Sequence, residues 1–447
     1  MSEITSYAVK DIALPKTTSA AVVLTLALAL VVLMLLAVAR ADAKEKILHE
    51  FRDEPTGASG VIFDSAGNLY GTTYYGGVGK HCASGCGTVF ELMPKVGGGW
   101  TEKLLYSFLG WTAGDGQYPA AGLILDSAGN LYGTTSVGGA DGTGNIGGIV
   151  FELTPGSNGQ WTEKILHSFQ NNGADGKVPL AGVIFDAPGN LYGTTSAGGA
   201  SGWGTVFELT PGAEGWTENV LYSFDNTNGS GLYPYAGVIF DTSGNLYGTT
   251  SAGGVDYGTV YELSSPRQRD GAWTMTTIHT FVGGSDGAGP GSASLIFDQE
   301  GNLYGTTAAG GIGKMGTVFE LSPANGLWME SRLYAFPASG EDGSNPRAGL
   351  VFGASGSLYG TTGIGGIPSD YCGNYAVSGC GTVFRLIPKA GGTWAETILY
   401  KFPVNGKNGL FPDSALALDS KGNLYGTTQL GGVDLPHTKG VAFEIVP

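Results

Sequence analysis

Short apolar runs, bounded by glycine, proline, asparagine or aspartate, follow one another along most of the chain. Residues 182–186, 190–195, 204–209 and 216–224 form one set of four such runs, separated by turns and a glycine-rich loop. The runs are rich in β-branched and aromatic residues, and each has the length of a strand. No window of the sequence has the period of an amphipathic helix. The pattern therefore predicts a unit of four short antiparallel strands.

This unit recurs along the chain. Its most constant part is Asn-Leu-Tyr-Gly-Thr-Thr, followed after a loop by Gly-Thr-Val-Phe-Glu-Leu. Seven copies, 55 to 66 residues apart, begin at Asn68, Asn130, Asn190, Asn245, Asn302, Ser357 and Asn423. A period of this size indicates a repeat architecture, and four-stranded units repeated around an axis form a β-propeller. We therefore expect an all-β, seven-bladed β-propeller over residues 44–447.

The fourth strand of the last unit is expected at the other end of the chain. Six fourth strands lie between the units, and they begin at Trp100, Trp161, Trp216, Trp273, Trp328 and Trp394. The segment from Ile47 to Phe51 aligns with the fourth-strand segment from Ile165 to Phe169. This N-terminal strand should complete the last blade as its outer strand. That pairing would close the ring and remove two sheet edges.

An apolar segment precedes the repeats. Residues 20–39 contain Thr25 as their only polar residue, two lysines lie upstream, and Ala41-Asp42-Ala43 follows. Residues 1–43 are therefore expected to be a helical signal peptide that is cleaved or a signal anchor that is not. Either alternative predicts a secreted, periplasmic or cell-surface protein, with membrane contact only through an uncleaved N-terminal segment.

Charge and cysteine content agree with export. Only 13% of the residues are charged and the net charge is −16, so no basic surface for nucleic acid is expected. The four cysteines fall in two loops as Cys82 with Cys86 and Cys372 with Cys380. Two local disulfides are the expected arrangement, since the spacings do not match a usual four-thiolate zinc site, which is the alternative.

Several polar residues recur at fixed positions in the repeat. An aspartate, Asp64 in the first unit, precedes Gly-Asn, where its side chain can cap its own turn; a Ca²⁺ loop is the alternative. A glutamate, Glu91 in the first unit, recurs on the third strand, and we interpret it as a hydrogen-bonding device between blades. His49, His167 and His279 replace tyrosines found elsewhere, so they are expected to be packed aromatic residues rather than ligands.

The repeated phrases resemble the GloVer (Gloeo/Verruco) tandem repeat of exported bacterial proteins, and the resemblance extends over nearly all of residues 44–447. It implies export but no particular activity. The unit is also similar to kelch repeats, with a strand, Gly-Gly, an aromatic strand and then tryptophan. Unit six departs from the pattern, because Gly353, Ser357 and Arg385 replace its aspartate, asparagine and glutamate.

Loop lengths locate a candidate binding sector. Between the Thr-Thr and Gly-Thr motifs lie 8, 7 and 8 residues in units three to five, but 13, 12, 18 and 11 in units one, two, six and seven. These four units become neighbours when the ring closes, and elaborated loops on a rigid scaffold are typical of binding sites. The sector carries Tyr74, Tyr75, His81, Asp141, Asp370, Tyr371, Asn374, Tyr375, Asp434 and His437. Its tyrosines suit stacking on sugars or packing on a protein, and its acids could hold a divalent cation.

No catalytic triad, paired-carboxylate motif, phosphate loop or metal motif is recognisable, and no catalytic residue is predicted. The leading hypothesis is a monomeric, non-catalytic binding module for an extracellular glycan or protein. It needs no cofactor, although Ca²⁺ is an alternative. A secreted enzyme acting on a glycan or lactone and a structural surface protein remain the other hypotheses, because propellers host many functions.

Overall fold

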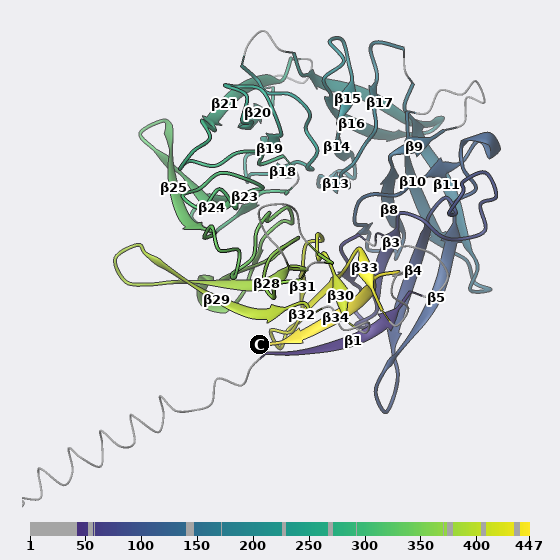
Figure 1. Cartoon of the computed structure of the whole chain (residues 1–447). Coiled ribbons are helices and arrows are strands. Elements are labelled where there is room, and N and C mark those ends of the chain that lie inside the picture. Colours follow the sequence, from purple (N-terminus) through teal and green to yellow (C-terminus); the bar gives the residue numbers. More distant parts are fainter. Residues whose placement is uncertain are drawn as a thin grey trace, which may run out of the picture. The chain divides into compact units, whose positions relative to one another are not determined.

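Seven four-stranded antiparallel sheets surround a common centre in the computed structural model (Figure 1). The structure describes residues 43–447 except 52–56, 58, 140–146, 171, 226–228, 267–270, 292, 370, 373–378, 404–407 and 433–438. Within these residues no helix is long and apolar enough to span a membrane. The expected signal or anchor segment lies outside the described residues. The predicted all-β, seven-bladed propeller is confirmed.

Each blade runs from a two-residue innermost strand to a longer outermost strand. Blade one contains, in this order, β2 (Ile62–Phe63), β3 (Leu69–Thr73), β4 (Thr88–Pro94) and β5 (Trp100–Ser107). Blade two contains β7 (Ile124–Leu125), β8 (Leu131–Thr135), β10 (Ile149–Pro155) and β11 (Trp161–Ser168). Blade three contains β13 (Ile184–Phe185), β14 (Leu191–Thr195), β16 (Thr205–Gly212) and β17 (Gly215–Ser223). Blade four contains β18 (Ile239–Phe240), β19 (Leu246–Thr250), β20 (Thr259–Ser264) and β21 (Thr274–Thr280). Blade five contains β22 (Ile296–Phe297), β23 (Leu303–Thr307), β24 (Thr317–Ala324) and β25 (Leu327–Ala335). Blade six contains β26 (Val351–Phe352), β27 (Leu358–Thr362), β28 (Thr382–Pro388) and β29 (Trp394–Lys401). Blade seven contains β31 (Ala417–Leu418), β32 (Leu424–Thr427), β34 (Val441–Val446) and β1 (Lys44–Glu50).

Short ladders brace the connections between blades. The connection into a blade pairs with the loop after that blade's second strand in β6 (Gly116–Gln117) with β9 (Val137–Gly138), β12 (Gly176–Lys177) with β15 (Ala197–Gly198), and β30 (Gly409–Leu410) with β33 (Leu430–Gly431). Single bridges occupy the equivalent place at Leu232, Ala288 and Ser344. The two 3₁₀ turns are η1 (Trp111–Ala113) and η2 (Ala354–Gly356). The connections into the blades and the loops after the second strands therefore lie on one face of the propeller, which we call the loop face.

The N-terminal strand closes the ring as predicted. Strand β1 pairs antiparallel with β34, from Lys44 opposite Val446 to Glu50 opposite Val441. Leu48 is buried, and Phe51, directly after β1, packs on Phe90 of blade one with ring centroids 5.0 Å apart. Figure 1 shows the first and last strands side by side, in purple and yellow. The last blade thus consists of both ends of the described chain.

The Asn-Leu-Tyr-Gly-Thr-Thr motif is explained by contacts within and between blades. A Cβ on Gly71 would lie 2.6 Å from the Phe90 ring, so only glycine fits there. The Thr72 hydroxyl donates to the backbone carbonyl of Ala121 in the connection into blade two, at 3.0 Å. Its counterpart Thr427 bonds the Ser59 carbonyl at 2.8 Å and so joins blade seven to blade one. The first threonine of the pair is therefore a hydrogen-bonding link between these neighbouring blades.

The repeated glutamate acts within its own blade, so the predicted role between blades is wrong. Glu91 accepts a hydrogen bond from the Tyr70 hydroxyl at 3.0 Å, and both belong to blade one. Asp64 caps its turn as predicted: its Oδ1 accepts from the Asn68 backbone and its Oδ2 from the Asn68 side chain and Tyr70. Burial raises the pKa of Asp64, but these hydrogen bonds outweigh it and leave the pKa below its usual value.

Blade six holds the same tyrosine in a different way. The Arg385 guanidinium lies over the Tyr359 ring, 5.4 Å from its centroid, and donates to the Ser357 hydroxyl at 2.9 Å. A Cβ at Gly353 would meet the Tyr359 ring at 2.2 Å. The three departures of this unit are therefore one coordinated change, in which a cation–π contact stands where the glutamate is found elsewhere.

Candidate functional site

A cavity of about 690 Å³ runs between the innermost strands and is the candidate site. Backbone and small side chains of the connections into each blade form most of its wall, such as Ala120 to Gly122 and Leu180 to Gly182. Larger or polar side chains line it at Tyr74, Tyr75, Tyr235, Arg347, Asp413 and Gln429. We call this space the central cavity.

One position of the repeat controls what these connections present to the cavity. It directly follows a proline and is occupied by Ala120, Leu180, Tyr235, Arg347 and Asp413 in the connections into blades two, three, four, six and seven. The residue before this proline has a left-handed backbone, with φ of 62° at Tyr118 and 59° at Phe411. This conformation is uncommon for residues other than glycine, so the surrounding fold must hold it in place. The repeat thus provides a fixed backbone on which the lining side chain varies.

Three tyrosines form a compact cluster at the cavity wall of blade one. Tyr74 stacks on Tyr118 with ring centroids 4.8 Å apart and planes 4° from parallel. Tyr75 contacts both rings edge-on, at 4.8 Å from Tyr74 and 5.5 Å from Tyr118. Burial raises the pKa of Tyr74 above its usual value, so its hydroxyl stays protonated. The cluster is therefore an aromatic surface with hydroxyl groups at the wall of the central cavity.

Asp413 is the only acidic residue among the described residues that line the cavity. Its Oδ2 accepts a hydrogen bond from the Gln429 side chain at 2.8 Å. Its Oδ1 is shielded from solvent and has no hydrogen-bond partner among the described residues. A Cβ on Gly363 would lie 2.2 Å from this Oδ1, so the glycine makes room for it. Burial raises the pKa of Asp413 to about 6, although the Arg347 guanidinium opposes this shift.

Arg347 and Asp413 come from consecutive connections, those into blades six and seven. The Arg347 Nε donates to Asn345 at 2.9 Å, which orients the guanidinium. One part of the wall therefore offers a cation and a carboxylate, and the side-chain amide of Gln429 adds further hydrogen-bonding groups. Such a wall can bind a ligand that carries several hydroxyl groups, and the Asp413 carboxyl is poised to exchange a proton near neutral pH.

The structure places only some of the predicted site residues. Tyr74 and Tyr75 line the central cavity, whereas His81 and Tyr371 are exposed on the loops next to the disulfides. Asp141, Asp370, Asn374, Tyr375, Asp434 and His437 lie outside the described residues. A single site spanning the four long loops therefore stays a prediction.

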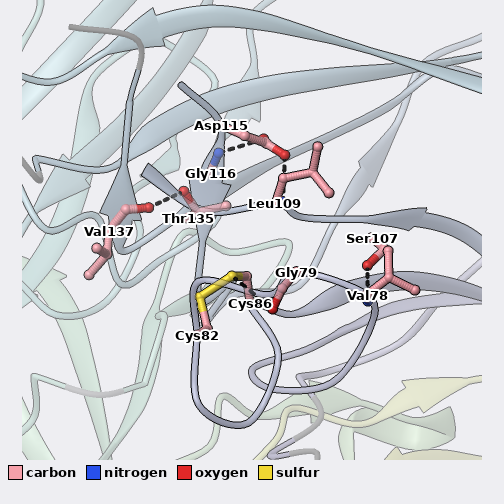
Figure 2. The surroundings of a disulfide bond; sticks show 10 residues. All are labelled: Val78, Gly79, Cys82, Cys86, Ser107, Leu109, Asp115, Gly116, Thr135 and Val137. Carbon is pink, nitrogen blue, oxygen red and sulfur yellow. Dashed lines mark hydrogen bonds between the residues drawn. A yellow bond between two sulfur atoms is a disulfide. The ribbon is translucent and has the colours of Figure 1, made fainter. Parts of the chain in front are cut away.

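Both predicted disulfides are present. Cys82 bonds Cys86, Cys372 bonds Cys380, and all four residues are buried. Figure 2 shows the first bridge beside Gly79, whose missing side chain lets Cys86 approach. In the same loop, the Val78 backbone donates to the Ser107 hydroxyl at the end of β5, at 2.7 Å (Figure 2). These contacts fix the loop that begins with Tyr74 and Tyr75.

Sequence reasoning missed Tyr235, Arg347, Asp413 and Gln429. For the first three, the available signal was variation at the repeat position after the proline, which holds alanine or leucine in other connections. Alignment of the seven connections would have shown an arginine and an aspartate after the proline in the connections into blades six and seven. Loop length alone directed attention away from the centre of the ring.

Comparison with known proteins identifies the repeat. Residues 145–373 and 268–447 match the model of the Gloeobacter/Verrucomicrobia repeat. No curated protein matches the chain. Among solved structures, a protein of unknown function from Dyadobacter fermentans matches with a TM-score of 0.45 and 11% identity, over 91% of this chain and 99% of that one. A gluconolactonase from Xanthomonas campestris matches with a TM-score of 0.39 and 16% identity, over 74% of this chain and 90% of that one.

Proposed function

Because the chain belongs to the Gloeobacter/Verrucomicrobia repeat family, and its repeats build a propeller around an open centre, we propose that it is an exported, non-catalytic binding module. Its ligand is an extracellular carbohydrate, which it holds in the central cavity. The two disulfides support an oxidising compartment outside the cytoplasm.

The asymmetry of the cavity wall carries this proposal. The scaffold repeats seven times, yet Arg347 and Asp413 stand at a position where other connections have Ala120 or Leu180. Ring closure does not need these charges, because the neighbouring blades pack without them. Placing a poorly solvated carboxylate next to an arginine carries a desolvation cost that the fold gains nothing from. The side chains are therefore better explained by a ligand than by the fold.

The chemistry of the wall favours a sugar. Carbohydrates present hydroxyl groups at the ring edge and apolar C–H groups on the ring face. Tyr75 and Tyr235 offer aromatic faces or edges to such a ring, and Asp413, Arg347 and Gln429 offer acceptors and donors to its hydroxyl groups. Rigid tyrosines lose little side-chain entropy on binding, which improves affinity for a small ligand.

Calorimetric titration of the chain with soluble bacterial and plant polysaccharides, with and without Ca²⁺, tests the proposal. Exchange of Asp413 for asparagine and of Tyr75 for alanine should each weaken binding to a polysaccharide that the unaltered chain binds. Tyr371→Ala is the matched control, because that tyrosine is exposed on a loop and does not line the central cavity. Loss of binding in Tyr371→Ala with unchanged binding in both cavity variants would move the site to the loops. Binding of a protein but of no polysaccharide would refute the carbohydrate assignment.

A second candidate function is a secreted enzyme acting on a glycan or a lactone. The observation in its favour is Asp413, whose pKa of about 6 suits a general acid or base near neutral pH. Turnover by the unaltered chain that disappears in Asp413→Asn, while ligand binding persists, would establish the enzyme and overturn the binding module. Binding without turnover would support the module.

A further inference from the structure

Where the outer strands of neighbouring blades meet, the repeat places a cluster of polar side chains that the proposed function does not use. Between blades two and three it consists of His167 at the end of β11, Asp175 in the following connection, and Glu218 on β17. Strands β11 and β17 contact each other at this junction. We call these three residues the junction cluster. One ligand atom from each lies within 4.8 Å of the other two, the separation of groups around a shared ion.

The cluster is held in place by its surroundings. The Asp175 Oδ2 accepts a hydrogen bond from the Gln170 backbone at 2.7 Å and lies 3.3 Å from the His167 Nε2. The His167 ring packs edge-on against Phe169 at 4.7 Å, which fixes the imidazole. The Asn172 side chain accepts from the Asp175 backbone at 2.9 Å and fixes the connection. The donor atoms therefore need little rearrangement to bind a ligand.

Two buried oxygens of the cluster lack a partner. Asp175 is only 8% exposed, and its Oδ1 has no hydrogen bond within the described chain. The same holds for the Oε1 of Glu218. Two carboxylates so close together and so poorly solvated require a cation or a proton between them. A neutral imidazole with two carboxylates would balance the charge of one divalent ion.

The other junctions show what is specific to this one. In blades one and five a tyrosine replaces the histidine, and its hydroxyl donates to the aspartate: Tyr106 to Asp115 at 3.0 Å and Tyr334 to Asp342 at 2.9 Å. A phenol hydroxyl in this place satisfies an aspartate oxygen, whereas an imidazole nitrogen can also ligate a metal.

Two further junctions extend the comparison. Between blades three and four, Ser230 and Met275 occupy the acid positions, so both carboxylates are absent together. Between blades four and five the same three residue types recur as His279, Asp286 and Glu330, with His279 3.5 Å from Asp286. Among the described residues, only the junction cluster brings three potential ligands within the distance of a shared ion.

We propose that His167, Asp175 and Glu218 form a binding site for one divalent transition-metal ion of the Zn²⁺ class. Imidazole nitrogen and carboxylate oxygen are both usual zinc ligands, and a site with three protein ligands leaves a fourth position for water. The imidazole favours zinc over Ca²⁺, which takes oxygen ligands. The bound ion would tie the outer strands of blades two and three together.

Calorimetric titration of the metal-stripped full chain with Zn²⁺ tests the site, with Ca²⁺ as the comparison ion. The His81→Ala background is used throughout to remove an exposed histidine. His167→Tyr copies the residue found at the equivalent positions 106 and 334, so the junction should still fold. Glu218→Gln removes one ligand with almost no change in shape. His279→Tyr is the matched control, because it makes the same exchange at the equivalent position in blade four.

We expect one Zn²⁺ per chain, a rise in melting temperature with Zn²⁺, and at least ~10-fold weaker binding in His167→Tyr and Glu218→Gln. His279→Tyr should bind as the unaltered chain does. Absence of stoichiometric Zn²⁺ binding would overturn the proposal and leave a shared proton as the explanation. Binding that both site variants retain would also overturn it. Should His167→Tyr fail to fold, Glu218→Gln with the Co²⁺ absorption spectrum of the substituted site decides the question.

Discussion

Replacing Phe51 with alanine tests whether the N-terminal strand stabilises the fold by closing the ring. Phe51 is 5% exposed and packs on Phe90 with centroids 5.0 Å apart. Its counterpart within the chain is Phe169, which is 2% exposed and packs on Phe207 at 5.1 Å. The two sites have nearly the same burial and the same aromatic neighbour. They differ in that Phe51 follows a strand that joins its blade only when the ring closes.

The expected magnitude follows from this burial. Truncating a buried phenylalanine to alanine lowers the free energy of unfolding by ~3–5 kcal/mol, through lost apolar transfer and the cavity left behind. A residue in a frayed terminus would change it by less than ~0.5 kcal/mol. If β1 closes the ring, Phe51→Ala and Phe169→Ala should therefore be destabilised by similar amounts.

Urea unfolding followed by tryptophan fluorescence measures both variants under non-reducing conditions. Exposed Lys44→Ala on the same strand is the control and should leave the midpoint nearly unchanged. The reasoning about closure would be refuted if Phe169→Ala showed the full loss while Phe51→Ala showed less than ~1 kcal/mol. A loss in both variants would agree with the pairing of β1 and β34.

Three further outcomes follow from other contacts. Burial and the Asp115 carboxylate raise the pKa of Glu163 from 4.5 to about 8, so the folded chain holds a proton that the unfolded chain releases, and the free energy of unfolding should fall as pH rises from about 4.5 to about 8. Glu163→Gln should flatten that slope in urea titrations across this pH range, and an unchanged slope would contradict the buried acid pair. Gly71→Ala should lower the free energy of unfolding strongly, because the new Cβ would lie 2.6 Å from the Phe90 ring. Gly129→Ala has open space around the new Cβ but a positive φ, so it should lower the free energy of unfolding by only ~1 kcal/mol; equal melting temperatures of the two variants would refute the packing argument. Replacing Cys82 and Cys86 with serine should lower the free energy of unfolding by ~2 kcal/mol, which is the chain entropy that a disulfide across so short a loop removes from the unfolded state. An unchanged urea midpoint would show that the bridge does not constrain the unfolded chain.

The repeat made the fold predictable, because each unit contains the sequence signals for its own strands and turns. Strand lengths, turns and the Thr-Thr motif recur in every unit, and the alignment of Ile47–Phe51 with Ile165–Phe169 located the missing strand. Disulfide pairing was predictable for the same reason, since each cysteine pair lies within one loop. Local regularity therefore determined the global arrangement.

The error about the glutamate came from ignoring strand register. Once Leu69 is paired with Leu92, Tyr70 must lie opposite Glu91 on the neighbouring strand, and directly opposed side chains interact. The hydroxyl and carboxylate then meet within a blade. The link between blades falls to Thr72, whose partner is a backbone carbonyl that no sequence motif marks.

The cavity could not be predicted from local patterns. Tyr75, Tyr235, Arg347 and Asp413 are far apart in sequence and meet only because the blades close around a centre. The junction cluster poses the same problem, since Glu218 reaches Asp175 from the next blade. The packing of His167 as an aromatic residue was predicted correctly. The prediction that it is not a ligand did not consider Asp175 and Glu218, which reach it only through the ring geometry.

The connection between blades is where both variable positions of this scaffold occur. Residues 169–183 carry Asp175 to the outer junction and, after the short strand β12, carry Leu180 and Ala181 to the cavity wall. In the connections into blades six and seven, Asp342 and Asn408 occupy the junction position, and Arg347 and Asp413 follow them at the cavity wall. Both ends of each connection are fixed by the ladders and by the proline, so substitutions there leave the strands unchanged. A cation at the junction would therefore hold the same backbone that shapes the cavity, and the two proposed sites share one structural element although each is tested independently.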